Sequence, residues 1–171
     1  FYRAFAREIK PFLLSQGGPV AMIQLDNELA GIHTWNGILD YNPETMGFFR
    51  QDGLYPCFMR DRYGNIAAVN AAYGTEYKDF TQIDPRVFSF TGNARARAEK
   101  DYHDFYCNHL AVYARTLLVM LRENGIDVPV TANAANAYLL NFLPELAHEM
   151  RKEKFFIGFD DYYGLDVQWA N

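Results

Sequence analysis

The sequence contains little cysteine and has no cluster of metal-binding residues at a recognisable spacing. Cys57 and Cys107 are the only cysteines among 171 residues, and their separation matches no metal-binding motif. Two isolated thiols are typical of a protein that is kept reduced inside a cell, so we expect a cytoplasmic location. A single disulfide between them stays open as an alternative.

Two further absences narrow the class of partner. The formal net charge is −5, whereas nucleic-acid-binding domains usually carry a basic surface. No apolar run approaches the roughly 20 residues of a membrane-spanning helix, and no secretory signal pattern is present in the sequence. We therefore expect neither nucleic acid nor a membrane as a partner.

The composition is that of a folded protein. Half of the residues are hydrophobic and 16% are aromatic, which excludes bulk disorder. The length is that of one domain. The first residues already follow the pattern of an amphipathic helix, and the last ones come directly after a predicted strand. We therefore expect the chain to be an internal piece of a longer protein.

Strands and helices are predicted to alternate. Three apolar runs of strand length are separated by long segments in which apolar residues recur at helical spacing. This alternation is typical of βαβ units and a parallel sheet. The predicted strands are 19–25, 128–134 and 155–160, and the predicted helices are 2–15, 96–124 and 140–153. After the first strand we expect three helical pieces, at 43–52, 54–63 and 65–73, and then an irregular stretch at 75–95.

Polar residues follow each predicted strand. Asp26, Asn27 and Glu28 end the first, Asn133 ends the second, and Asp160 with Asp161 ends the third. The carboxyl ends of parallel strands meet at one edge of a sheet, where α/β proteins bind their ligands. A glutamate placed there after an apolar strand is a good candidate for a general acid or base.

Four segments, in order, resemble the β-galactosidases of glycoside hydrolase families 35 and 42. Residues 17–28 resemble their fourth barrel strand, in which a glycine-proline turn leads to an apolar run that ends Asn-Glu. Residues 60–75 resemble the Arg-Tyr-Gly, Leu-Asn, Trp-Gly-Thr insertion of family 42, although Tyr73 stands where tryptophan is usual. Residues 130–133 and 159–163 resemble strands five and six.

This resemblance implies a fold and an activity. The fold would be α/β, part of a (β/α)₈ TIM barrel with parallel strands and a helical insertion at about 43–95. The activity would be that of a retaining exo-β-glycosidase, in particular a β-galactosidase that releases terminal β-galactose. Glu28 would be the general acid/base and Asn27 the contact to the sugar 2-hydroxyl. In these families the nucleophile lies on the seventh strand, so this piece alone would lack it.

Other residues near the strand ends are candidates for sugar binding. The predicted substrate contacts are Asn133, Asp161, Tyr163 and Trp35. The alternative for Trp35 is ordinary loop packing, and the alternative for Asp161 is capping of the next segment. A structural role, such as pairing with an arginine, is expected for Asp26. We expect no cofactor, because two carboxylates suffice for glycoside hydrolysis. We also expect no metal, since the two separated cysteines do not support the zinc found in some members of family 42.

Several alternatives stay open at this point. An exo-β-glucosaminidase or a β-glucosidase would use the same residues, and a non-catalytic carbohydrate-binding barrel would use part of them. A nucleotide-binding α/β protein is disfavoured, because no glycine-rich phosphate loop follows any strand. The sequence also leaves open a homo-oligomer formed through parts of the protein outside this chain.

Overall fold

The computed structural model describes residues 1–27, 41–86, 89–134 and 150–159. The chain divides into two compact units, one formed by Phe1–Gly37 with His109–Asn171 and the other by Ile38–Asn108. The long helix α6, Gly92–Glu123, contributes residues to both units. Among the described residues, no helix is both long and apolar enough to span a membrane.

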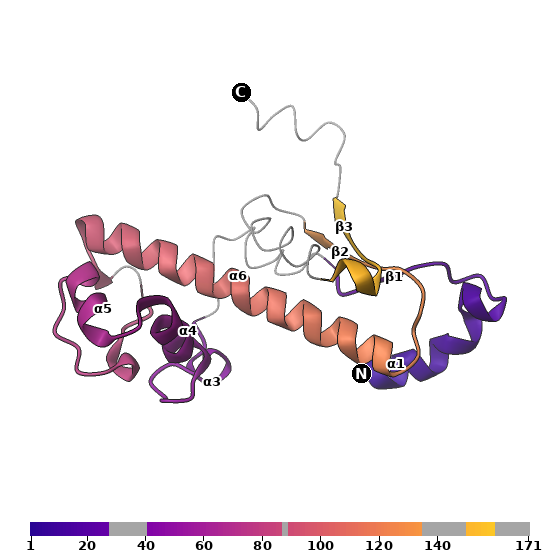
Figure 1. The fold of residues 1–171 in the computed structure, drawn as a ribbon, viewed down its shortest axis with the longest axis horizontal. Coiled ribbons are helices and arrows are strands. Elements are labelled where there is room, and N and C mark those ends of the chain that lie inside the picture. Colours follow the sequence, from indigo (N-terminus) through magenta and orange to yellow (C-terminus); the bar gives the residue numbers. More distant parts are fainter. Residues whose placement is uncertain (28–40, 87–88, 135–149, 160–171) are drawn as a thin grey trace, which may run out of the picture. The chain divides into compact units, whose positions relative to one another are not determined.

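The first unit contains a parallel three-stranded sheet in the order β1-β2-β3 (Figure 1). β1 is Ile23–Gln24, β2 is Val130–Ala134 and β3 is Phe155–Phe159. Ile23 is aligned with Val130, and Val130 is aligned with Phe155. The prediction of parallel strands is therefore confirmed.

β1 is much shorter than the predicted strand 19–25. Val20 pairs with the N-terminal segment instead of the sheet: its N–H donates to the Phe12 carbonyl at 2.9 Å, and its carbonyl accepts from the Leu14 N–H at 2.8 Å. This local pairing takes up the backbone groups that a longer strand would offer to β2. The apolar run at 19–25 thus pairs first with the N-terminal segment, through Val20, and then with β2, through Ile23 and Gln24.

The first predicted helix is also shorter. α1 spans Tyr2–Ile9, and two 3₁₀ turns, Lys10–Phe12 and Leu14–Gln16, replace the rest of the predicted helix 2–15. Pro11 lacks the N–H that an α-helix needs at that point, so the helix ends before it. Leu13 is nevertheless fully buried, because the turn directs it into the core of this unit.

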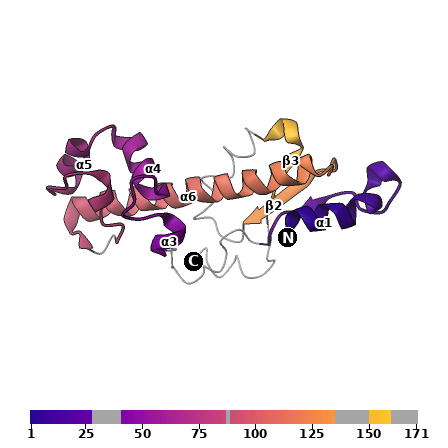
Figure 2. The same ribbon diagram turned by 90° about the horizontal axis from the view of Figure 1, so that it is seen from below.

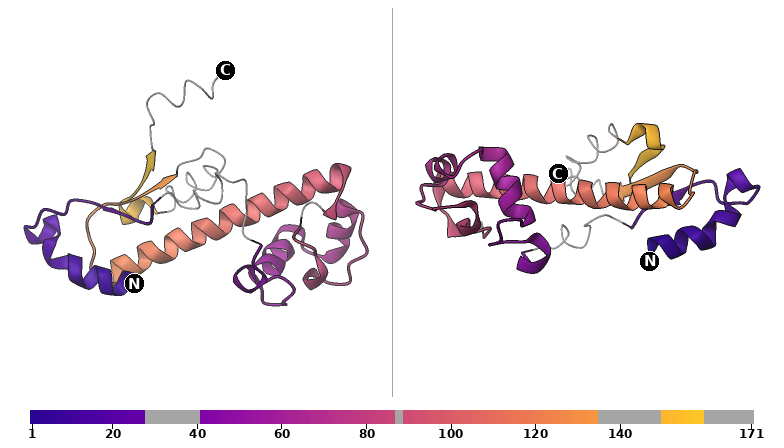
Figure 3. Two further views of the ribbon diagram at one scale, coloured as in Figure 1. Left: turned by 180° about the vertical axis from the view of Figure 1, so that it is seen from behind. Right: turned by 60° about the horizontal axis from the view of Figure 1, so that its bottom comes forward.

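The core of the first unit lies between the sheet and the C-terminal half of α6 (Figures 1 and 3). Leu117, Leu118 and Leu121 on the helix are buried, as are Ile23 and Leu25 on and after β1. Each such side chain stabilises the fold by about 1.5–3 kcal/mol through removal from water. α6 begins four residues before the predicted start at 96, and Gly125 follows its end with a φ of +84°.

The described end of the predicted helix 140–153 is not α-helical. Its residues 140–149 lie outside the described residues, and Arg151–Glu153 form a 3₁₀ turn. The Lys154 N–H closes this turn by donating to the Arg151 carbonyl at 3.1 Å. β3 starts directly afterwards and matches the predicted strand 155–160 to within one residue.

The second unit holds the three helical pieces predicted after the first strand (Figure 2). They are α3, Pro43–Met46; α4, Leu54–Tyr63; and α5, Ile66–Tyr73. The Asn42 side chain caps α3 by accepting from two backbone N–H groups, and Asn65 caps α5 by accepting from the Ala68 N–H at 3.0 Å. α3 is shorter than predicted, because Gly47 leaves the helix at a φ of +67°.

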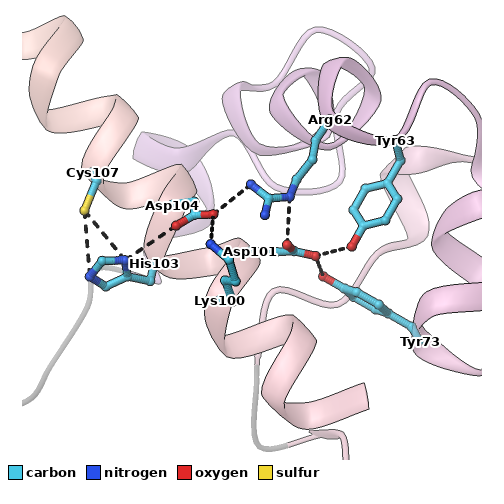
Figure 4. Close-up of polar contacts among 8 residues, drawn as sticks. All are labelled: Arg62, Tyr63, Tyr73, Lys100, Asp101, His103, Asp104 and Cys107. Carbon is cyan, nitrogen blue, oxygen red and sulfur yellow. Dashed lines mark hydrogen bonds and ion pairs between the residues drawn. The ribbon is translucent and has the colours of Figure 1, made fainter. Parts of the chain in front are cut away.

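A fully buried carboxylate holds the helices of the second unit together (Figure 4). The hydroxyls of Tyr63 and Tyr73 both donate to Oδ2 of Asp101, on α6. Oδ1 of Asp101 makes no hydrogen bond among the described residues, and its partner is the charge of Arg62, whose Nε lies 2.8 Å away. Burial and the hydrogen bond to Asp101 raise the pKa of Tyr63 to about 12.

Arg62 also pairs with a more exposed acid one helical turn further along α6. Its Nη1 lies 2.8 Å from Oδ2 of Asp104, and the Nζ of Lys100 lies at the same distance from that oxygen. Burial alone would raise the pKa of Asp104, but the hydrogen bonds from Lys100 and Arg62 outweigh it and lower that pKa. Arg62 therefore pairs with two acids that differ in burial, the fully buried Asp101 and the partly exposed Asp104.

We predict that Asp101→Ala lowers the free energy of unfolding by about 3 kcal/mol, because it leaves two tyrosine hydroxyls and one face of Arg62 without their buried acceptor. Asp104→Ala is the matched control and should cost about 1 kcal/mol or less, since its carboxylate is partly solvated. Urea denaturation of both variants measures the difference. Equal losses would contradict a dominant role for Asp101.

Candidate functional site

The carboxyl edge of the sheet is fixed by the pairing of β1 with β2. Gln24 is aligned with Thr131, and the Leu25 N–H donates to the Thr131 carbonyl at 2.7 Å. This bond continues the pairing one residue beyond β1. The chain then passes through Asp26 and Asn27 at the edge where Asn133 lies on β2.

Side-chain alternation places two polar residues on one face of these strands. Ile23 and Leu25 are buried, so Gln24 between them is directed to the opposite face. On β2, Val130 and Ala132 are fully buried, and Asn133 therefore lies on the same face as Gln24. The Nε2 of Gln24 donates to the Oδ1 of Asn133 at 2.9 Å.

The side-chain nitrogen of Gln24 also bonds to Asn27, the residue that follows Asp26. The Nε2 of Gln24 donates to the Oδ1 of Asn27 at 3.2 Å. Gln24, Asn27 and Asn133 thus form an amide cluster at the carboxyl edge, in which one donor group serves two acceptors. An uncharged cluster of this kind can bind hydroxyl groups through its remaining donors and acceptors.

Asp26 has a different environment from the amide cluster. Its Oδ1 accepts the Asn27 N–H at 3.0 Å, and its Oδ2 accepts the Tyr113 hydroxyl of α6 at 3.2 Å. The Tyr2 hydroxyl accepts the Asp26 N–H at 3.2 Å. Burial, reinforced by the charge of Asp26, raises the pKa of Tyr113, so this tyrosine stays a donor at neutral pH. Among the described residues, Asp26 pairs with Tyr113 rather than with the arginine expected from the sequence.

Two of the six predicted site residues can be placed, and the structure brings them together. Asn27 and Asn133 both contact Gln24. Glu28, Trp35, Asp161 and Tyr163 lie outside the described residues. Sequence reasoning missed Gln24, although it is the single polar side chain within an apolar strand.

A hollow of about 290 Å³ lies at the opposite edge of the sheet, among the residues that precede β2 and β3. Arg122 forms part of its wall and donates from Nη1 to the Ile126 and Val128 carbonyls at 2.8 and 2.9 Å. These bonds give the arginine a structural function there. Ligands of α/β sheets bind at the carboxyl ends of the strands, so the amide cluster, and not this hollow, is the candidate site.

The described residues offer no alternative metal centre. Within the described ranges, no group of three or more histidine, cysteine, aspartate or glutamate side chains is placed to hold a metal ion. Cys57 and Cys107 are both free thiols. Burial, with a smaller effect of the Asp104 charge, raises the pKa of Cys107 to about 11, so its thiol is a poor nucleophile at neutral pH.

A parallel sheet with amide and carboxyl groups at its carboxyl edge is typical of α/β proteins that bind a ligand at that edge. A comparison with models of known families narrows this class, because residues 2–168 match the glycoside hydrolase family 42 model, described as beta-galactosidase. The chain belongs to this family. The resemblance to family 42 is thereby confirmed.

A similar fold is found in a solved β-galactosidase structure. The crystal structure of a β-galactosidase from Bacillus circulans sp. alkalophilus matches 96% of this chain with a TM-score of 0.60 and 21% sequence identity. The match confirms an α/β fold with parallel strands, similar to part of that β-galactosidase. This chain covers 23% of the solved chain.

Curated relatives carry other names. A β-1,2-glucosyltransferase from Ignavibacterium album is 29% identical over 117 residues, which is 68% of this chain and 15% of the relative. A thermophilic β-amylase from Thermoanaerobacterium thermosulfurigenes is 29% identical over 126 residues, which is 63% of this chain and 23% of the relative. The chain therefore spans less than a quarter of either relative.

We predict that Asp26 and Tyr113 are energetically coupled, because the tyrosine hydroxyl donates to the carboxylate that also holds the Asn27 N–H. In a double-mutant cycle of Asp26→Ala and Tyr113→Phe, urea denaturation should give a coupling free energy of about 1 kcal/mol. Losses that add to within about 0.3 kcal/mol would show that this hydrogen bond does not hold the end of β1.

Proposed function

We propose that this chain is part of a retaining exo-β-glycosidase that releases terminal β-galactose from oligosaccharides or glycosides. The observation that carries the proposal is the amide cluster of Gln24, Asn27 and Asn133 at the carboxyl edge of the sheet, in a domain of glycoside hydrolase family 42. Glu28 directly follows Asn27 in the sequence. A carboxyl group and a sugar-binding amide are thereby contributed by adjacent residues.

In the proposed reaction Glu28 protonates the glycosidic oxygen while a second carboxylate attacks the anomeric carbon. Retaining enzymes hold the two carboxyl groups about 5–5.5 Å apart. The attacking carboxylate is proposed to come from a strand that follows β3 in the barrel. Water, activated by Glu28 as a base, then releases the sugar with its original anomeric configuration.

The amide cluster suits this chemistry because it is uncharged. In retaining enzymes an apolar setting or the charge of the attacking carboxylate raises the pKa of the general acid, and a neutral cluster leaves these effects unopposed. Asn27 can donate to the sugar 2-hydroxyl, an interaction that strengthens as the transition state forms. Asn133, Trp35, Asp161 and Tyr163 remain proposed substrate contacts, with Asn133 close enough to share a bonding partner with Asn27.

One of the two relatives favours glycosyl transfer as a second candidate activity. The match to a β-1,2-glucosyltransferase is a specific observation in its support. A glycosyl-enzyme intermediate can be intercepted by a sugar hydroxyl in place of water, so the same residues would serve both outcomes. Product analysis with an acceptor sugar separates the two: a new disaccharide indicates transfer, and free monosaccharide indicates hydrolysis.

We predict that Glu28→Gln in the full-length protein lowers kcat/KM by about 10²–10⁴-fold on aryl β-galactosides with poor leaving groups, because these need protonation to depart. The loss should be much smaller with good leaving groups. Steady-state rates across a panel of aryl β-glycosides, which includes glucosides, measure both effects and identify the sugar.

Glu123→Gln is the matched control, because this glutamate is exposed on α6 and away from the strand ends. Its rates should equal those of the wild type. A Glu28→Gln variant with wild-type rates on every substrate would contradict the assignment of the acid. A wild-type protein that binds galactosides without cleaving them would support a carbohydrate-binding barrel instead.

A further inference from the structure

We propose that Gln24 is a specificity-determining positioning residue: it fixes the Asn27 amide so that its N–H groups are presented to the sugar 2-position. The site would then select β-glycosides that carry an acceptor oxygen at C2 and reject 2-ammonium sugars. This inference rests on the proposed function. It also decides between two activities that the sequence left open, galactosidase and glucosaminidase, because a glucosaminidase must accept a 2-ammonium group.

The orientation of Asn27 follows from its hydrogen-bond partner. The Nε2 of Gln24 is a pure donor, so the Asn27 atom 3.2 Å away from it must be the acceptor, Oδ1. The Nδ2 of Asn27 is then directed to the other side of its amide group. This nitrogen makes no hydrogen bond with any described residue, and Asn27 is exposed.

Gln24 is itself held in place by a second hydrogen bond, so it can fix the orientation of the Asn27 amide. Its other bond goes to the Oδ1 of Asn133 at 2.9 Å, and Asn133 is only 6% exposed. The two hydrogens of the Gln24 amide nitrogen suffice for these two acceptors. Rotating the Asn27 amide by half a turn would set two donors against each other, which disfavours that orientation by about tenfold.

The chemistry of the sugar decides which substrates fit this arrangement. A 2-hydroxyl oxygen can accept a hydrogen bond from the Asn27 amide, whereas a 2-ammonium group has donors only. Two donors facing each other in the bound complex lose the bond and leave both groups poorly solvated. The amide cluster is thus matched to galactosides and glucosides rather than to glucosaminides.

The test compares kcat/KM for an aryl β-galactoside with that for its 2-deoxy and 2-amino-2-deoxy analogues, at about pH 6 in the full-length protein. The variants are Gln24→Met, Gln24→Glu and Asn27→Ala. The ratio of two substrates within each variant cancels general losses of activity, and its comparison with the wild-type ratio cancels the intrinsic reactivity of each substrate. A purely structural role of Gln24 would not change these ratios.

We expect the wild type to prefer the 2-hydroxyl substrate strongly. Gln24→Met and Asn27→Ala should each reduce this preference about tenfold. The double variant that combines these two substitutions should show no further change, because both remove the same oriented donor. Gln24→Glu should shift the preference further toward the 2-amino substrate, because a carboxylate attracts the Nδ2 of Asn27 and turns its carbonyl to the sugar.

Met22→Glu is the matched control for added negative charge. Met22 lies two residues before Gln24 and its side chain is exposed, but it contacts neither asparagine through a hydrogen bond. It should leave the ratio of 2-amino to 2-hydroxyl rates, which Gln24→Glu is expected to shift, close to its wild-type value. A shift in Met22→Glu equal to that in Gln24→Glu would overturn the orientation argument.

Failure of this inference differs from failure of the proposed function. If Asn27→Ala changes the ratios and both Gln24 variants keep them, Gln24 does not position Asn27, while the glycosidase assignment stands. If the wild type prefers the 2-amino substrate, the predicted selection is wrong and the enzyme is a glucosaminidase. If the wild type cleaves no β-glycoside, the proposed function fails and this inference fails with it.

Discussion

The candidate site depends on one backbone pairing, that of β1 with β2. β1 has only two residues, and the hydrogen bond from the Leu25 N–H to the Thr131 carbonyl extends its hold on β2 by one more. This register sets Gln24 within reach of Asn133. A shift by one residue would turn Gln24 into the core and Leu25 out to solvent, which the burial of Leu25 opposes.

The two units are stabilised in different ways, and the difference bears on function. The second unit is organised around Asp101, a buried charge with tyrosine and arginine partners on two other helices. Such a network is rigid only when it is complete. The carboxyl edge of the sheet instead carries, beside Asp26, a cluster of neutral amides whose remaining donors and acceptors are proposed to bind a sugar. The buried charge of Asp101 and the proposed binding surface therefore lie in different units of the chain.

The strands and the polar residues at their ends could be predicted from the sequence, because both depend on patterns of neighbouring residues. Apolar runs gave the parallel strands, and polar strand ends gave Asn27 and Asn133. The remainder depended on contacts between distant segments. Val20 leaves the sheet because Phe12 and Leu14 bind its backbone, and Asp26 accepts from Tyr113, which is 87 positions away in the sequence. Gln24 was missed because a lone polar residue in an apolar strand gives no sign of which residues face it.

The most direct test of the central claim is a crystal structure of the full-length Glu28→Gln variant with an uncleaved aryl β-galactoside bound. We predict that the sugar lies at the carboxyl edge of β1 and β2. Its 2-oxygen should accept a hydrogen bond from the Nδ2 of Asn27, while the Oδ1 of Asn27 stays on Gln24. A sugar bound elsewhere would overturn the proposed site, and an Asn27 amide that presents its oxygen to the sugar would overturn the proposed role of Gln24.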